Sequence, residues 1–374
     1  MTEQKRKKAF IAMSGGVDSS VAALIATNSG MDCVGVTLKL FKAADEDKSS
    51  LGTRAFDEDE DEFSVGIRTF AEAIAANGVA KLIGIPHHIH DNACEFTEFV
   101  IDYFIDAYAN GLTPNPCIEC NRRIKLGMLL DQMKIAGYDY VVTGHYARIV
   151  FDETKRRFLL LRAKDRSKDQ SYMLYTMTQD QLAHTLFPLG DLSKSRVREI
   201  AAENGFKNAE ERDSQDICFV PDGDYAGFIE RHLGQVFPEG DYIDTEGRVI
   251  GRHKGIIRYT IGQRKGLGAA FGVPHYVLTK DAKRNAVVLG SESMLYSKRV
   301  LARDVNLISV DRIIQPMRVT AKTRYTQHDM PATVVQTEEG RLELEFDEPQ
   351  RAAAPGQALV IYDGDVVVGG GTII

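Results

Sequence analysis

In the first two hundred residues, apolar and polar positions follow two patterns: short apolar runs typical of strands, and longer stretches with helical periodicity. The apolar runs predict strands, which we place at residues 9–13, 33–41, 81–88 and 138–143. The periodic stretches predict helices, which we place at residues 18–28, 95–108, 121–135 and 194–204. Strands separated by helices predict an α/β fold with a doubly wound parallel sheet, whose ligands bind at the carboxyl ends of the strands.

In the second part of the sequence the pattern of apolar and polar positions predicts mainly strands. Short apolar runs between turn residues predict a small β-rich central region over residues 213–290. Alternation at residues 318–325 and 341–346, with hairpin turns at residues 338–340 and 363–365, predicts a C-terminal barrel or sandwich, of which we take the β-barrel. We therefore expect three domains, at residues 1–212, 213–292 and 293–374.

Charge changes this picture at one place. The net charge is −7, from 46 Lys and Arg against 53 Asp and Glu, but six of the acids are consecutive at residues 57–62. These lie in an aperiodic stretch, residues 42–63, that predicts a solvated mobile loop, with a regulatory or cation-binding role as the alternative. Without the six acids the net charge is −1 (−7 plus 6), so the acidity does not exclude a nucleic-acid partner. Basic residues that could contact nucleic acid are Arg122, Arg123, Lys125, Arg252, His253, Lys254, Arg258, Arg264 and Lys265.

The number of cysteines and the lengths of the apolar runs indicate in which cellular compartment the protein is found. Five cysteines are too few for a disulfide framework, and their odd number leaves a thiol unpaired, which is typical of the reducing cytosol. The basic start at residues 5–8 is followed by only five apolar residues, too few for a signal peptide. No apolar run approaches the roughly 18 residues that span a bilayer. We expect a cytoplasmic protein without a membrane partner.

A glycine-rich loop follows the first predicted strand and precedes the first predicted helix. Two adjacent glycines let the backbone approach an anion, and the helix N-terminus adds positive potential. A P-loop of the Walker type would carry a lysine here, and this loop has none. The loop therefore predicts a phosphate site of another type, and its sequence is Ser14-Gly15-Gly16-Val17-Asp18-Ser19-Ser20.

A pair of cysteines, Cys117 and Cys120, stands at the start of the predicted helix 121–135. A thiol at a helix N-terminus near Arg122 and Arg123 is expected to have a lowered pKa and more thiolate. The alternatives are a zinc site, although four ligands at the usual spacing are missing, or two inert thiols. Cys218 lies about a hundred residues further on and, by itself, would be read as a core cysteine.

Seven ordered motifs, spread over nearly the whole sequence, resemble the tRNA-specific 2-thiouridylase family of the ATP pyrophosphatase superfamily. Besides the glycine-rich loop they are residues 113–121 (TPNPCIECN), 143–148 (TGHYAR), 168–172 (KDQSY), 213–219 (DSQDICF), 260–268 (TIGQRKGLG) and 322–325 (KTRY). The resemblance implies an N-terminal domain like that of adenine-nucleotide hydrolases and an enzyme that thiolates C2 of the wobble uridine in tRNA. It also implies that ATP, with Mg²⁺, is cleaved to AMP and pyrophosphate to activate the C2 oxygen.

The resemblance assigns roles to individual residues. Cys120 is implied as the nucleophile and Cys218 as the cysteine that carries a persulfide, the two forming a disulfide after each turnover. The positions implied to contact ATP are Ala12, Met13, Ser14, Gly15, Gly16, Val17, Asp18, Ser19, Leu38 and Gly144. The positions implied to contact the target base or the tRNA are Asn115, Pro116, Cys117, His145, Lys168, Asp169, Gln170, Arg324, Tyr325 and Gln357. The implied partners are the anticodon loop of the tRNA, since the base must leave its stack to react, and a sulfur donor such as a cysteine desulfurase or a sulfur relay protein.

One position departs from the commoner family pattern. Many members carry an acidic residue, associated with general acid/base catalysis, where this chain has Cys117. Cys117, Cys120 and Cys218 could instead hold a four-iron, four-sulfur cluster with one open iron, as in related sulfur-transfer enzymes. A cluster-dependent variant is therefore kept beside the persulfide route. Two other functions also stay open at this point: a ligase or amidotransferase of the same superfamily that acts on a small molecule, and a non-catalytic RNA-binding protein.

Overall fold

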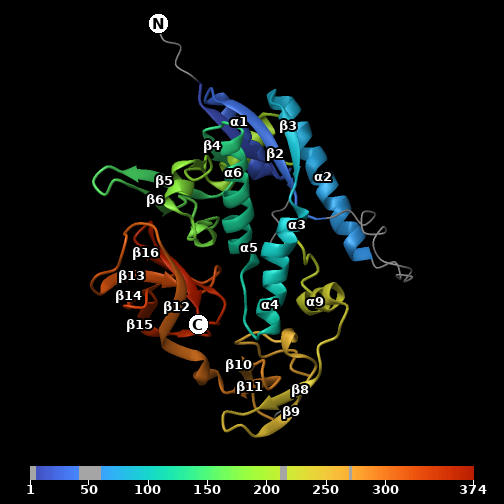
Figure 1. The fold of residues 1–374 in the computed structure, drawn as a ribbon, viewed down its shortest axis with the longest axis vertical. Coiled ribbons are helices and arrows are strands. Elements are labelled where there is room, and N and C mark those ends of the chain that lie inside the picture. Colours follow the sequence, from blue (N-terminus) through green and yellow to red (C-terminus); the bar gives the residue numbers. More distant parts are fainter. Residues whose placement is uncertain (1–5, 42–59, 211–216, 269–271) are drawn as a thin grey trace. The chain divides into compact units, whose positions relative to one another are not determined.

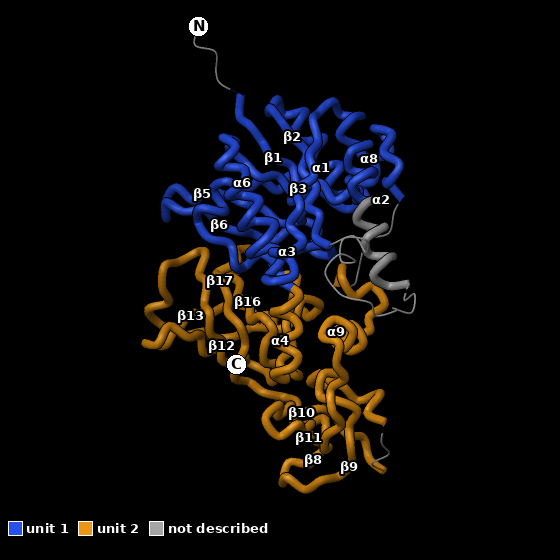
Figure 2. Tube along the Cα trace, turned by 45° about the vertical axis from the view of Figure 1, so that its right-hand side comes forward, with its two compact units in different colours: residues 1–100, 118–215 blue, residues 101–117, 216–374 orange. Residues whose placement is uncertain are grey.

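The computed structural model describes residues 6–41, 60–210, 217–268 and 272–374, and of residues 60–70 it describes the backbone alone. The chain forms two compact units (Figure 2). Unit 1 contains residues 1–100 and 118–215, and unit 2 contains residues 101–117 and 216–374. The chain therefore enters unit 2 for a short stretch, returns to unit 1, and leaves it again after residue 215.

Unit 1 is built on a five-stranded parallel sheet (Figure 1). The strands follow the order β3-β2-β1-β4-β7, so that the first strand of the chain lies in the centre. The middle residues of β1, Ala9, Phe10 and Ile11, are all apolar and buried because both faces of this strand are covered. The bounds are β1 Lys8–Ala12, β2 Asp32–Lys39, β3 His87–Asp91, β4 Tyr140–Val142 and β7 Thr185–Leu186.

Helices cover both faces of this sheet. On one face α1 (Val17–Asn28), α2 (Glu60–Ile83) and α8 (Lys194–Glu203) share an apolar core with β1. On the other face α6 (Leu129–Ile135) packs against β1, β2 and β4. The doubly wound parallel sheet predicted from the alternation is confirmed.

Two long helical stretches contain π-helical segments, in which hydrogen bonds run to the fifth residue rather than the fourth. The first consists of α3 (Ala93–Phe96), η2 (Thr97–Asp102) and α4 (Tyr103–Ala109). The second consists of α5 (Pro116–Glu119), η3 (Cys120–Met128) and α6. The π-helical turn η3 begins at Cys120, and such turns occur frequently at functional sites.

Two predictions for unit 1 are wrong. The expected strand at 81–88 is instead the last turn of α2 followed by β3, because the core-facing apolar residues of α2, Ala76, Val79, Ala80 and Ile83, recur at helical spacing. The expected loop at 42–63 ends earlier, since α2 begins at Glu60; negative charge in a first helical turn is favourable. The other acids of the run, residues 57–59, lie outside the described residues.

Unit 1 also contains a hairpin and several short elements. The hairpin pairs β5 (Ala147–Asp152) with β6 (Arg157–Arg162). The short elements are η4 (Ser171–Leu174) and α7 (Gln179–Ala183). In the described part of the chain no helix is both long and apolar enough to span a membrane.

The central part of unit 2 is a four-stranded sheet of order β10-β11-β8-β9, preceded by α9 (Tyr225–Leu233). The sequence predicted the strands of this region but not the helix, whose nine residues are too short for a clear period. The other elements are β8 Gly240–Ile243, β9 Val249–His253, η5 Ile256–Arg258, β10 Tyr276–Asp281, β11 Ala286–Gly290 and η6 Glu292–Leu295.

The C-terminal part of unit 2 is an antiparallel barrel. Six strands follow the order β12-β15-β14-β13-β16-β17, and β17 pairs back onto β12 to close it. The residues facing inward are the alternate apolar ones, with Leu342, Leu344 and Phe346 of β15 almost completely buried. The strands are β12 Tyr296–Leu307, β13 Met317–Lys322, β14 Met330–Gln336, β15 Leu342–Arg351, β16 Ala358–Asp363 and β17 Val366–Ile373. The predicted fold class, including the choice of a barrel over a sandwich, is confirmed.

Candidate functional site

The glycine-rich loop connects the end of β1 to the start of α1. Gly15 has a φ of +80°, and a Cβ there would lie 2.5 Å from the Glu72 carbonyl oxygen of α2. The hydroxyls of Ser19 and Ser20 donate to the Gly16 carbonyl oxygen at 3.0 and 2.9 Å, and the Ser14 amide donates to Ser19 Oγ at 3.2 Å. No side chain caps the N-terminus of α1, so its first amides are available to an anion.

Asp18, the acidic residue of the loop, is held by two side chains from distant parts of the sequence. The Lys194 ammonium at the start of α8 lies 2.8 Å from both Asp18 carboxylate oxygens, and the Tyr146 hydroxyl donates to one of them at 2.8 Å. The Lys194 side chain is only 10% exposed, whereas that of Asp18 is 32% exposed. Lys194 could not be predicted as part of this site, because a lysine after the helix-capping Ser193 carries no local signal of such a role.

Asn208 is a second residue that the sequence did not reveal. Its side-chain amide is buried and donates to the Gly15 carbonyl oxygen at 2.6 Å and to Ser20 Oγ at 3.0 Å. Its Oδ1 atom is buried and has no hydrogen-bond partner among the described residues. Asn208 therefore ties the loop to the segment that follows α8.

The predicted ATP positions come together at the carboxyl edge of the sheet. Gly144, just after β4, lies so close to α1 that a Cβ would be 2.7 Å from the Asp18 carbonyl carbon and 2.8 Å from the Ser19 nitrogen. The backbone of Met13 at the end of β1 accepts a hydrogen bond from Thr37 of β2 at 2.7 Å, and Leu38 follows on the same strand. The remaining predicted positions are Ala12, Ser14, Gly15, Gly16 and Val17, which belong to the end of β1, the loop and the start of α1.

Several positions predicted to contact RNA have structural partners in unit 1. His145 is buried; burial, with Lys125 nearby, lowers its pKa to about 3, so its ring is neutral, and Nδ1 lies 2.8 Å from Thr143 Oγ1. Asp169 accepts from the Ala163 amide at 2.9 Å and the Ser171 hydroxyl at 2.8 Å. Gln170 accepts from the Tyr146 amide at 2.9 Å, and Lys168 beside them is half-buried.

The two cysteines of the CxxC pair differ in exposure. Cys117 in α5 is exposed, whereas Cys120 at the start of η3 is buried. The guanidinium groups of Arg122 and Arg123, which we expected to act on these thiols, lie 3.6 and 3.7 Å from the Glu119 carboxylate. Cys117 belongs to unit 2 and Cys120 to unit 1.

Cys218 is half-buried in unit 2 and is followed by an anchoring aromatic residue. Phe219 is buried, with its ring 5.3 Å from that of Phe104 in α4 and 5.2 Å from that of Phe228 in α9. The first four residues of the predicted motif, 213–216, lie outside the described residues. Across the described part of the chain, no three His, Cys, Asp or Glu side chains are grouped so that they could hold a metal ion.

In unit 2 two of the predicted RNA-contacting residues, Arg324 and Gln357, bind backbone atoms. The Arg324 guanidinium donates to the carbonyl oxygens of Ala352 at 2.7 Å and Ile261 at 3.3 Å. The Tyr325 ring lies below the Lys322 ammonium, 5.8 Å away. Gln357 donates to the carbonyl oxygens of Thr113 and Pro114, just before two of the positions predicted to meet the target base. Of these, Asn115 is half-buried and Pro116 is buried.

The predicted basic residues of the central sheet are only partly available at the surface. His253 is buried, and burial lowers its pKa, so the prediction that it contacts nucleic acid from the surface is wrong for this structure. Arg252 and Arg258 are exposed but form ion pairs with Asp241 and Glu230. The remaining exposed basic residues of the set are Lys254, Arg264 and Lys265.

A parallel α/β sheet with a glycine-rich loop at its carboxyl edge is typical of nucleotide-binding domains. The sequence matches the family described as tRNA methyl transferase HUP domain over residues 7–222. It also matches the tRNA methyl transferase PRC-barrel domain over residues 226–291 and the aminomethyltransferase beta-barrel domain over residues 297–373.

Curated relatives are similar over almost their whole length. A tRNA-specific 2-thiouridylase MnmA from Clostridioides difficile is 47% identical over 98% of this chain and 98% of its own. Proteins of the same name from Acetivibrio thermocellus and Moorella thermoacetica are 45% and 47% identical, covering 98% and 97% of this chain and 99% and 98% of their own. The chain belongs to the tRNA-specific 2-thiouridylase family.

Proposed function

We propose that this protein is a tRNA-uridine 2-sulfurtransferase, which uses ATP to replace the C2 oxygen of the wobble uridine by sulfur. The observation that carries the proposal is the N-terminus of α1, which no side chain caps and which packs closely against Gly144 at the carboxyl edge of the sheet. The relatives carry the name of this activity, which supports the choice of tRNA as the acceptor.

ATP solves the problem that a carbonyl oxygen is a very poor leaving group. The C2 oxygen attacks the α-phosphorus of ATP, pyrophosphate departs, and C2 becomes bonded to an adenylate that can leave as AMP. The amides at the start of α1 and the Ser19 hydroxyl hold the pyrophosphate part. Asp18 and Ser19 offer the hard oxygen ligands that suit Mg²⁺, which neutralises phosphate charge when bound.

The sulfur step uses two cysteines. A persulfide on Cys218 attacks C2 through its outer sulfur, and AMP is expelled. The Cys120 thiolate then attacks the Cys218 sulfur, so that the sulfur–sulfur bond breaks, its electron pair stays on the transferred sulfur, and a Cys120–Cys218 disulfide forms. An external thiol reduces that disulfide, and the persulfide is restored by a donor such as a cysteine desulfurase or a sulfur relay protein.

The remaining assignments follow from the same proposal. Asn115, Pro116 and Cys117 meet the target base after it leaves the anticodon-loop stack. His145, Lys168, Asp169, Gln170, Arg324, Tyr325 and Gln357 contact the tRNA or hold the loops that do. The protein works in the cytoplasm as three domains, at residues 1–212, 213–292 and 293–374.

The cluster-dependent variant is the alternative to this sulfur step. Cys117, Cys120 and Cys218 have the right chemistry for iron, but the described residues form no metal-holding group of three, so we derive no step through a cluster. Anaerobically purified protein is expected to contain iron only at background level and to lack a broad absorbance near ~400 nm, the signature of thiolate-bound clusters. Stoichiometric iron with that absorbance would replace the persulfide route.

The activity is tested by incubating unmodified tRNA with the protein, ATP and a persulfide-carrying donor. Thiolated tRNA is retarded in a gel that contains immobilised mercury, and pyrophosphate release is measured in parallel. We expect retarded tRNA and pyrophosphate release that depends on tRNA. Pyrophosphate release without tRNA would favour the small-molecule ligase, and no release under either condition would favour a non-catalytic RNA-binding protein.

A further inference from the structure

The short connection between α4 and α5, residues 111–114, is held on two sides within unit 2. Gly111 has a φ of +75°, and a Cβ there would lie 3.2 Å from Lys280 Cβ. Gly356 has a φ of +91°, and a Cβ there would lie 3.0 Å from both Leu112 Cβ and the Thr113 nitrogen. The connection therefore packs tightly against β10 of the central sheet and against the turn before β16 of the barrel.

Lys280 holds the first side of the connection. Its ammonium donates to the Leu112 carbonyl oxygen at 3.2 Å and lies 5.3 Å from the centre of the Tyr108 ring of α4. The residue is only 9% exposed, and burial lowers the pKa of its ammonium to about 8. Within the described part of the chain no carboxylate forms an ion pair with it, so this buried charge is compensated by a carbonyl dipole and a ring face. Removing the partner of a buried charge is strongly destabilising, so Lys280 and the Leu112 carbonyl hold each other in place.

Gln357 holds the second side. Its side-chain amide donates to the carbonyl oxygens of Thr113 at 3.0 Å and Pro114 at 3.3 Å. The Thr113 amide in turn donates to the Pro355 carbonyl oxygen at 2.9 Å. Gln357 itself is fixed in the barrel, because its carbonyl oxygen accepts from the Ile373 amide at 2.8 Å.

We propose that Lys280 and Gln357 are positioning residues, which together clamp residues 111–114 and so set the place of Asn115, Pro116 and Cys117. The clamped connection ends one residue before Asn115, and Pro114 and Pro116 restrict the backbone on both sides of it. A displacement at Pro114 is therefore carried to Cys117 with little local adjustment. The expected effect of the clamp on tRNA thiolation rests on the proposed function, whereas its expected effect on the position of Cys117 does not.

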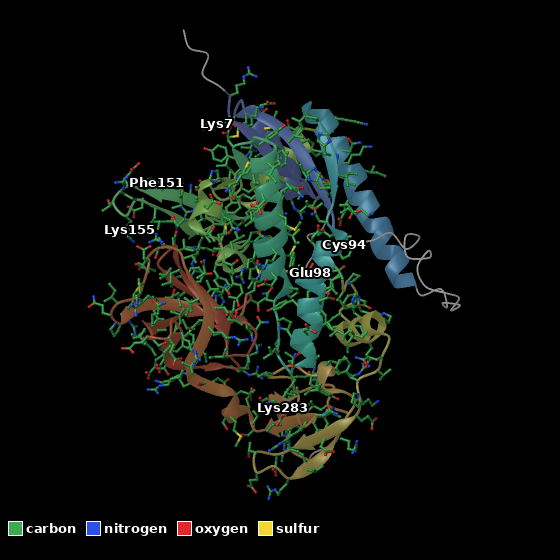
Figure 3. The ribbon with its side chains drawn as sticks, in the orientation of Figure 1. Lys7, Cys94, Glu98, Phe151, Lys155 and Lys283 are labelled. Atoms are coloured by element: carbon green, nitrogen blue, oxygen red, sulfur yellow. The ribbon has the colours of Figure 1, made fainter. Side chains whose placement is uncertain are left out.

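The test compares Lys280→Met with Lys283→Met. Lys283 lies in the turn between β10 and β11 and is exposed (Figure 3), so its replacement removes the same charge from the same hairpin without touching the connection. Iodoacetamide labelling, followed peptide by peptide by mass spectrometry, measures the reactivity of the exposed Cys117. Cys94, exposed on α3 in unit 1, serves as the internal reference, and half-buried Cys218 reports general loosening of unit 2.

In Lys280→Met we expect the labelling rate of Cys117 to change several-fold while those of Cys94 and Cys218 stay as in the parent protein. The kcat for tRNA thiolation should fall by about tenfold or more with the KM for ATP unchanged, because small misplacement of a reacting group is costly. Gln357→Leu, which removes the other half of the clamp, should change both readouts in the same direction. If Lys280→Met does not fold, the same two measurements on Gln357→Leu test the proposal.

Several outcomes separate the clamp from the proposed function. If Cys117 in both Lys280→Met and Gln357→Leu is labelled at the rate found in Lys283→Met, the clamp is refuted. A parallel rise at Cys218 would also refute it, because the lysine would then only stabilise unit 2. If labelling of Cys117 changes selectively but the parent protein does not thiolate tRNA, the clamp stands and the proposed function fails.

Discussion

Replacing Cys218 or Cys120 by serine is expected to lower the rate of tRNA thiolation by more than about 10³-fold when a persulfide-carrying protein supplies the sulfur. A serine hydroxyl at position 218 cannot carry a persulfide. A serine at position 120 is not ionised near neutral pH and is a poor nucleophile toward sulfur. The measurement is the retardation of thiolated tRNA in a mercury-containing gel, at a fixed concentration of donor.

The matched control for these variants is Cys94→Ser, since Cys94 is an exposed cysteine on α3 with no role in the proposed chemistry (Figure 3). It should thiolate tRNA at the parent rate. With free sulfide in place of the protein donor, Cys218→Ser should recover activity, because sulfide can attack the adenylated C2 directly. Full activity of either Cys120→Ser or Cys218→Ser with the protein donor would show that sulfur does not pass through these thiols.

Lys194→Met is expected to lower tRNA-dependent pyrophosphate release by about 10²-fold. The ammonium lies 2.8 Å from both carboxylate oxygens of Asp18, the acidic residue of the phosphate loop. Without the ammonium, the carboxylate keeps the hydrogen bond from Tyr146 but loses its positive partner, and the less compensated negative charge beside the site of the phosphates weakens ATP binding. The loop should also be destabilised, by about 1–3 kcal/mol in unfolding free energy, since a partly buried charge loses its partner.

Lys164→Met is the control for this variant. Lys164 also forms an ion pair, with Asp191 at 3.0 Å, but the two side chains are 63% and 61% exposed. Exposed pairs contribute about 0–1 kcal/mol, so neither pyrophosphate release nor the urea midpoint should move appreciably. If Lys194→Met behaved like Lys164→Met in both measurements, the contact with Asp18 would have no part in ATP chemistry.

The glycine-rich turn from β1 into α1 could be predicted because the residues that form it are neighbours in the sequence. Gly15, Asp18 and Ser19 stand within five residues, between an apolar run and a periodic stretch, and this context predicts an anion site. The alternation of strands and helices likewise predicted the sheet, since a strand covered on both faces is apolar throughout. By contrast, Lys194 and Asn208 reach the loop from 176 and 193 residues away, and no local pattern distinguishes them from surface residues.

The wrong and missed elements have a common physical origin. A short apolar run fits a strand and part of a helix equally well, and the first three residues of the strand expected at 81–88 belong to α2. The partners of Gln357 could not be read from the sequence either, since they are backbone atoms of Thr113 and Pro114, 244 and 243 residues away. The sequence also does not show which thiols belong to the same compact unit, because that depends on packing. Cys117 and Cys120 are close in sequence, but Cys117 belongs to unit 2 and Cys120 to unit 1.

The excursion of residues 101–117 into unit 2 limits how this protein can be recombined. The three family matches follow one another along the chain, as though each domain were a separable module. A cut after residue 222 would leave α4 attached to the first module, while Tyr225 and Lys280, which contact the ring of Tyr108, went with the others. Tyr108, at 6% exposure in the intact chain, would then lose both contacts and face water, which favours aggregation. The N-terminal module is therefore a poor unit for domain exchange, even though its own sheet is complete.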